Sequence, residues 1–113
     1  MIRQISIVLC LFAFLSCKKE SARTITYEVI LSNATSWSGN YLNENAVLIE
    51  VSNQKSGWKH SFKDTNGLLV LVLSAEPDTF NNNSDALMNI YVDGKLYAKG
   101  TYNNDVYLNI PFN

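Results

Sequence analysis

Apolar and polar residues alternate with a period of two through most of the chain after residue 23. Residues 24–31 place Ile25, Tyr27, Val29 and Leu31 on one face, and residues 46–52, 58–63 and 106–112 repeat the pattern. The inward sets predicted for these three segments are Val47, Ile49 and Val51; Trp58, His60 and Phe62; and Val106, Leu108 and Ile110. From residue 24 onward no window of eleven residues follows the helical period, so the pattern predicts an all-β domain.

Two segments depart from simple alternation. Residues 68–73 are apolar on both faces, which predicts a central strand covered on both sides. Residues 37–42 are interrupted by Ser38, Gly39 and Asn40, which predicts an edge or bulged strand.

Residues 88–98 form two alternating runs around Asp93-Gly94, the pattern of a β-hairpin. A two-residue loop would place Tyr91 opposite Leu96 and mix inward with outward positions. A three-residue loop, 92–94, with Gly94 in a left-handed bulge, places Ile90 opposite Leu96 instead. We therefore expect the three-residue loop.

About seven short strands, separated by turn clusters rich in Asn, Asp, Gly and Ser, predict a two-sheet antiparallel β-sandwich, with a small closed barrel as the alternative. The longest connection, 76–85, is expected to cross between the sheets and to be mobile.

The N-terminal segment has the order of an export signal: Arg3, then an uncharged apolar run over residues 5–15, then Ser16-Cys17. The run is shorter than the about 20 residues that a spanning helix needs; a buried N-terminal helix is the alternative. Ser16-Cys17 resembles the bacterial lipobox, and Phe14 in place of the usual Leu resembles lipoproteins of the Bacteroidota. The resemblance implies a signal peptide at 1–16, a lipidated Cys17 with a short tether at 17–23, and a domain at 24–113.

The cysteines and Lys18 indicate the compartment of the protein, and its net charge disfavours one class of partner, nucleic acid. Cys10 leaves with the signal and Cys17 is consumed by lipid, so the exported domain would contain neither a disulfide nor a free thiol. Lys18 stands where the enterobacterial inner-membrane signal has Asp, so we expect an envelope protein held by lipid at the outer membrane. The formal net charge of −1 leaves no basic surplus for nucleic acid.

Four stretches, at residues 25–29, 58, 71–75 and 90–95, are similar in order and spacing to the MmpS family of membrane-associated transport accessory proteins. The resemblance implies an immunoglobulin-like β-sandwich and a large envelope transporter as partner. This chain has a lipoprotein signal in place of that family's membrane-spanning helix, and it lacks the cysteine pair of the mycobacterial members.

Little in the sequence points to catalysis or to a cofactor. His60, the sole histidine, shares a face with Trp58 and Phe62, so we expect it to be packed and not a catalytic or metal-binding group. Asp78, Asp85 and Asp105 lack the spacing of a calcium loop and are expected to be solvated turn residues. We expect neither an enzyme, nor a metal, nor a cofactor.

Aromatic residues offer the better functional candidates. Tyr91, Tyr97 and Tyr107 are expected to point outward and Trp37 to lie near a weak edge, which together would make an interaction face. The alternative is that the tyrosines only cover a solvated sheet. The expectation is a non-enzymatic interaction or transport-accessory lipoprotein, or alternatively a small glycan- or lipid-binding module at the cell surface.

Overall fold

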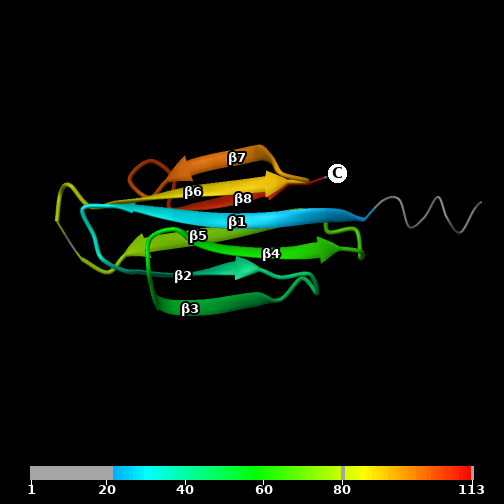
Figure 1. The fold of residues 1–113 in the computed structure, drawn as a ribbon, viewed down its shortest axis with the longest axis horizontal. Helices are drawn as coiled ribbons and strands as arrows, with labels where there is room; N and C mark the ends of the chain where they lie inside the picture. Colours follow the sequence, from blue (N-terminus) through cyan, green and yellow to red (C-terminus); the bar gives the residue numbers. More distant parts are fainter. Residues whose placement is uncertain (1–21, 80, 113) are drawn as a thin grey trace, which may run out of the picture.

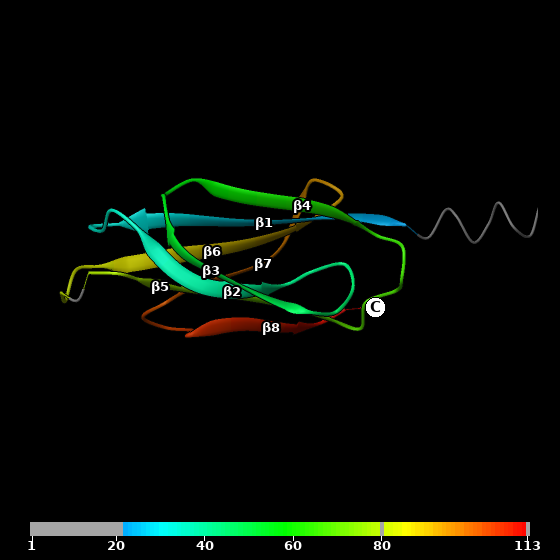
Figure 2. The ribbon, with the colours of Figure 1, turned by 90° about the horizontal axis from the view of Figure 1, so that it is seen from below.

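The computed structural model describes residues 22–79 and 81–112, and these form eight β-strands in two antiparallel four-stranded sheets. The strands are β1 (Arg23–Ser32), β2 (Trp37–Leu42), β3 (Leu48–Gln54), β4 (Trp58–Asp64), β5 (Val70–Pro77), β6 (Asp85–Val92), β7 (Lys95–Thr101) and β8 (Tyr107–Pro111). The sheets lie face to face (Figures 1 and 2). The predicted all-β sandwich is confirmed, with eight strands where about seven were expected.

The two sheets have the orders β4-β1-β6-β7 and β3-β2-β5-β8. Two hairpins, β2-β3 and β6-β7, stay within a sheet, and every other connection crosses from one sheet to the other, including the one between β5 and β6 as predicted. The first two strands therefore lie in different sheets, whereas the immunoglobulin constant order keeps them in one. The architecture is a sandwich with its own strand order.

The sandwich has two ends that differ in what they contain. One, which we call the Arg23 end, holds the start of β1, the loops 43–47, 65–69 and 93–94, and the end of β8 (Figure 1). The opposite end, which we call the Trp37 end, holds the start of β2 and the connections 33–36, 55–57, 78–84 and 102–106.

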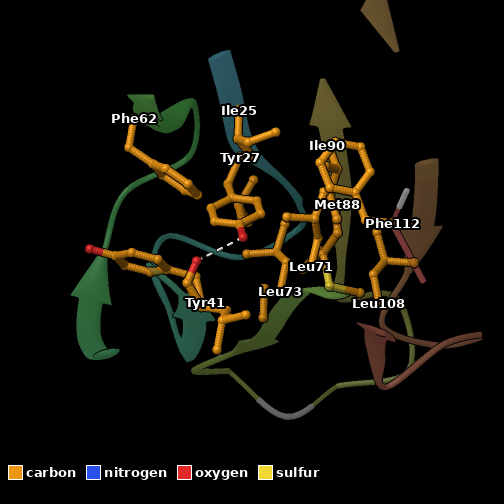
Figure 3. Close-up of a cluster of buried hydrophobic side chains, with 14 of the residues drawn as sticks. Ile25, Tyr27, Tyr41, Phe62, Leu71, Leu73, Met88, Ile90, Leu108 and Phe112 are labelled. Carbon is orange, nitrogen blue, oxygen red and sulfur yellow. Dashed lines mark hydrogen bonds between the residues drawn. The ribbon is translucent and has the colours of Figure 1, made fainter. Parts of the chain in front are cut away.

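The core is built from the alternating positions that the sequence predicts. Ile25, Tyr27 and Val29 are fully buried, and so are residues of β5 and β6, namely Leu71, Leu73, Ala75, Ala86, Met88 and Ile90. Figure 3 shows six of these side chains in the core: Ile25, Tyr27, Leu71, Leu73, Met88 and Ile90. Burying each large apolar side chain contributes about 1.5–3 kcal/mol. Val47 and Val106, predicted to face inward, are 51% and 64% exposed, because both precede the strands in which the alternation begins.

The strand β2 is central and not at an edge, because it pairs with both β3 and β5. The predicted irregularity is present, since the register with β3 shifts between Trp37 and Gly39. A Cβ on Gly39 would overlap the carbonyl oxygen of Ser74 and lie 2.7 Å from its carbonyl carbon. The polar residues that suggested an edge therefore mark a point where two backbones pass too closely for a side chain.

The β6-β7 hairpin corrects the predicted register. Val92 pairs with Lys95, so the loop has two residues, Asp93 and Gly94, both with positive φ (51° and 82°), as in the tight turns that suit hairpins. Tyr91 lies opposite Leu96, but Ile90 lies opposite Ala98, because Tyr97 is an extra residue in β7. The bulge that restores the inward alignment thus lies at Tyr97, two residue pairs beyond the turn.

Candidate functional site

Trp37, expected on an exposed interaction face, is fully buried. Its ring meets that of Trp58 edge to face, with the ring centroids 5.1 Å apart. The expectation of exposure was wrong because it depended on an edge position for β2, and β2 is central.

The three tyrosines predicted to form one face lie in three separate places. Tyr91 is half-buried on the outer face of the β4-β1-β6-β7 sheet, beside its cross-strand neighbour Leu96. Tyr97, at the bulge, packs edge to face on Phe112 at 5.1 Å and donates a hydrogen bond to the carbonyl oxygen of Pro111. Tyr107 is 53% exposed and lies opposite Ser74 in the other sheet. The structure does not gather them on one face.

A polar cluster lies on the outer face of the first sheet. Glu28 Oε1 accepts hydrogen bonds from Asn89 Nδ2 at 3.0 Å and Tyr91 Oη at 2.8 Å, and Lys59 Nζ lies 3.5 Å from Oε2. The hydrogen bond from Asn89, with further contributions from Tyr91 and Lys59, lowers the pKa of Glu28 from 4.5, against the effect of partial burial. The bond to the carboxylate raises the pKa of Tyr91. This cluster ties β4, β1 and β6 together.

His60 lies between the sheets, where aromatic rings surround it. Its ring is 4.6 Å from that of Tyr41 in the facing sheet, 6.0 Å from Phe62 and 6.1 Å from Trp58, measured between centroids. The predicted packing against Trp58 and Phe62 is confirmed.

The loop aspartates serve local structure at the Trp37 end. Asp78 accepts hydrogen bonds from the hydroxyls of Ser36 and Ser38, at 2.7 and 2.8 Å. Asp85 accepts from the backbone N–H groups of Ala86 and Asn103. Within residues 22–79 and 81–112, no three His, Cys, Asp or Glu side chains gather closely enough to hold a metal ion.

A pocket opens at the Arg23 end, between the loops 43–47 and 65–69. Its volume is about 440 Å³. Leu42 and Leu68, both nearly buried, line it together with Val70, and the exposed Leu69 and Ala46 line it from the loops. We call this the Arg23-end pocket. The sequence pattern did not indicate this pocket, because it assigned residues 68 and 69 to an apolar strand. In the structure that strand, β5, begins only at Val70.

Hydrogen bonds hold both loops around this pocket. Asn66 Nδ2 donates to the carbonyl oxygen of Glu44 at 3.1 Å and so joins one loop to the other. The Asn43 side-chain oxygen accepts from the N–H groups of Asn45 and Val47, at 2.9 and 3.0 Å. The backbone N–H of Phe112 donates to the carbonyl oxygen of Leu69 at 2.9 Å. The pocket is therefore a formed feature of the fold.

A buried ion pair supports the loop 65–69. The Asp64 side chain is fully buried and accepts from Arg23 Nη2 at 3.1 Å and from the N–H groups of Asn66 and Leu68. The Arg23 guanidinium carbon also lies 3.8 Å from the centroid of the Phe112 ring. Arg23, expected in the tether, is thus part of the domain. A charged residue next to the alternating segment 24–31 was the available signal, but its partner lies 41 residues away.

Cys17, the predicted lipid-attachment residue, and the predicted signal at 1–16 lie outside the described residues. In the described part of the chain no helix has the length and apolar character needed to cross a membrane. No protein-family model matches the chain, and no curated protein is significantly similar to it.

Proposed function

We propose that this protein is a lipid-anchored domain of the cell envelope, attached through Cys17, that acts by binding and not by catalysis. The order of Arg3, the apolar run and Ser16-Cys17 supports export and lipidation. Several acyl chains, each contributing about 0.8 kcal/mol per buried CH₂, would anchor it stably.

The observation that carries the proposal is where the exposed apolar residues lie. Val47, Leu48 and Leu69 are 51%, 54% and 81% exposed, and all belong to the Arg23 end. Cys17 precedes Arg23 by six positions, so the intervening chain spans at most about 22 Å. An anchor at Cys17 would therefore hold this apolar end next to the bilayer.

Acylation and location test the proposal directly. The full chain, expressed in a Gram-negative host fed with labelled palmitate, should incorporate the label and sediment with membranes. Cys17→Ser should remove the label, while Cys10→Ser, the matched control, should leave it unchanged. An unlabelled wild-type protein with an intact N-terminus would refute the anchor.

The resemblance of residues 25–29, 58, 71–75 and 90–95 to the MmpS family supports a transporter or another envelope protein as the partner. Tyr107 and Leu96 are exposed apolar groups on the two outer faces of the sandwich, so each face gives one test position. Crosslinking of the full chain in membranes should capture a defined protein, and Tyr107→Ala or Leu96→Ala should weaken capture. Failure of both variants to change the yield would remove the outer faces as contact surfaces.

The alternative of a lipid-binding module is favoured by one feature, the apolar Arg23-end pocket. Its volume of about 440 Å³ falls in the range typical of small-molecule sites. Binding of lipid vesicles by the unlipidated Cys17→Ser chain would support this function, and its failure to bind vesicles of any composition would count against it.

A further inference from the structure

Apolar side chains are exposed unevenly over the sandwich. Of the eight large apolar or aromatic side chains that are exposed among the described residues, five lie toward the Arg23 end: Val47, Leu48, Leu69, Leu96 and Tyr97. Leu69 is the most exposed of all, at 81%. Concentration of exposed apolar groups at one end marks an interaction site more strongly than scattered exposure does.

The exposure of Leu69 is imposed by the backbone. Its carbonyl oxygen accepts the N–H of Phe112, and the preceding residue, Leu68, donates its N–H to the buried carboxylate of Asp64. Gly67, with a φ of 69°, turns the chain just before them. Because these hydrogen bonds fix the backbone around Leu69, its side chain stays exposed to solvent and is available to contact an apolar ligand.

The chemistry of the pocket lining favours an apolar ligand. Leucine, valine and alanine side chains line most of it, and the amide of Asn66 is already used on the carbonyl oxygen of Glu44. A sugar would find few free polar partners there. Glu44 is the one charged residue that lines the pocket among the described residues, so an anionic group bound there would meet a like charge.

We propose that the Arg23-end pocket binds one linear acyl chain attached through an uncharged ester or amide group, in preference to a free fatty-acid anion. This inference deepens the lipid-binding alternative of the proposed function and rests on it. Two sources of such a chain lie within reach: an acyl group on Cys17 itself, within about 22 Å of Arg23, or a separate lipid of the bilayer.

Native mass spectrometry of the full chain tests the pocket and the source together. The protein is extracted from membranes in digitonin, whose rigid steroid body does not mimic a linear chain. Covalent mass on the N-terminal segment reports acylation, and a non-covalent adduct reports occupancy of the pocket. A non-covalent adduct on both wild type and Cys17→Ser identifies a separate lipid, and an adduct on Cys17→Ser alone identifies the protein's own acyl group as the usual occupant.

Two exposed apolar positions give a matched pair of variants. Leu69→Glu places a carboxylate at the pocket and should lower the fraction of protein that carries the adduct by about tenfold. Val106→Glu makes the same change at the opposite end, where Val106 is 64% exposed, and should leave the adduct unchanged. In added palmitate, Glu44→Gln should take up more of the anion than wild type does.

The outcomes separate the pocket from the anchor. Absence of an adduct from both wild type and Cys17→Ser, equal loss in Leu69→Glu and Val106→Glu, or a lipid-free dimer would overturn the pocket assignment. A non-covalent adduct on wild-type protein that carries no covalent lipid would keep the pocket and refute the anchor. Covalent lipid on the wild type, without any non-covalent adduct on Cys17→Ser, would keep the anchor and refute the pocket.

Discussion

Replacing Asp64 with alanine removes the group that joins the start of β1 to the loop 65–69. The lost carboxylate accepts hydrogen bonds from Arg23 and from the backbone N–H groups of Asn66 and Leu68. The N–H of Leu68 would remain buried without an acceptor, and the guanidinium of Arg23, whose side chain is 23% exposed, would lose its counter-charge.

The expected loss of stability is about 3–5 kcal/mol. An unpaired buried N–H costs about 1–3 kcal/mol, and breaking a buried ion pair by removing one partner costs about 3–5 kcal/mol. The partial exposure of Arg23 reduces the contribution of the ion pair, so we expect the two contributions together to amount to about 3–5 kcal/mol. For a domain of this size the Tm should fall by at least about 12 °C.

Urea unfolding, followed by tryptophan fluorescence, measures this loss. Trp37 and Trp58 lie at the other end of the sandwich and so report global unfolding. Glu50→Ala, which removes an exposed carboxylate on β3, is the matched control and should change the unfolding free energy by less than about 0.5 kcal/mol.

A double-mutant cycle with Arg23→Met isolates the contribution of the pair. We expect a coupling of about 0.5–3 kcal/mol between Asp64 and Arg23, as for residues in direct contact. A loss below about 1 kcal/mol for Asp64→Ala, with zero coupling, would refute the reasoning and return Arg23 to the tether.

Three further changes test other parts of the fold. Gly39→Ala should destabilise the protein by about 1–3 kcal/mol or more, because the new Cβ would overlap the backbone of Ser74; a thermal melt matching wild type would show that the two strands can move apart. Tyr27→Phe should cost about 1–3 kcal/mol in urea unfolding, because the buried hydroxyl donates to the carbonyl oxygen of Leu42 at 2.8 Å (dashed line in Figure 3), and Tyr107→Phe, at an exposed position, should cost nothing. The lowered pKa of Glu28 means that its carboxylate stabilises the fold above its ordinary pKa of 4.5 and that this contribution disappears as the pH falls through the lowered value; Glu28→Gln should therefore lose less stability than wild type between pH 6 and pH 2, and identical pH profiles would contradict the assignment.

The alternating segments were predictable because a strand buries every second residue wherever one face meets the core. Ile25, Tyr27 and Val29 follow this rule, and so do Trp58, His60 and Phe62 on β4. The hairpin at Asp93-Gly94 was predictable from its turn residues, but its register was not. The bulge is at Tyr97, whose ring packs on that of Phe112 in a later segment of the chain, and the pattern of the hairpin alone does not contain this contact.

The candidate contact residues were less predictable than the strands. Exposure depends on which strands become neighbours, and the pattern of a single strand does not contain that information. Trp37 became buried when β2 took a central place between β3 and β5, and the three tyrosines were divided among two outer faces and one bulge.

By itself the sequence determined that the body of the chain is built of β-strands, because the period of two is a local property that each segment expresses alone, and it favoured a sandwich over a closed barrel. It also contains the signal-like pattern that ends at Cys17. Only the tertiary structure decided the strand order, the Arg23–Asp64 pair and the pocket between the loops 43–47 and 65–69. Apart from the two hairpins, the strand pairs join residues more than 20 positions apart, and so do the ion pair and the Asn66–Glu44 hydrogen bond beside the pocket. Such contacts form only when distant segments of the chain come together.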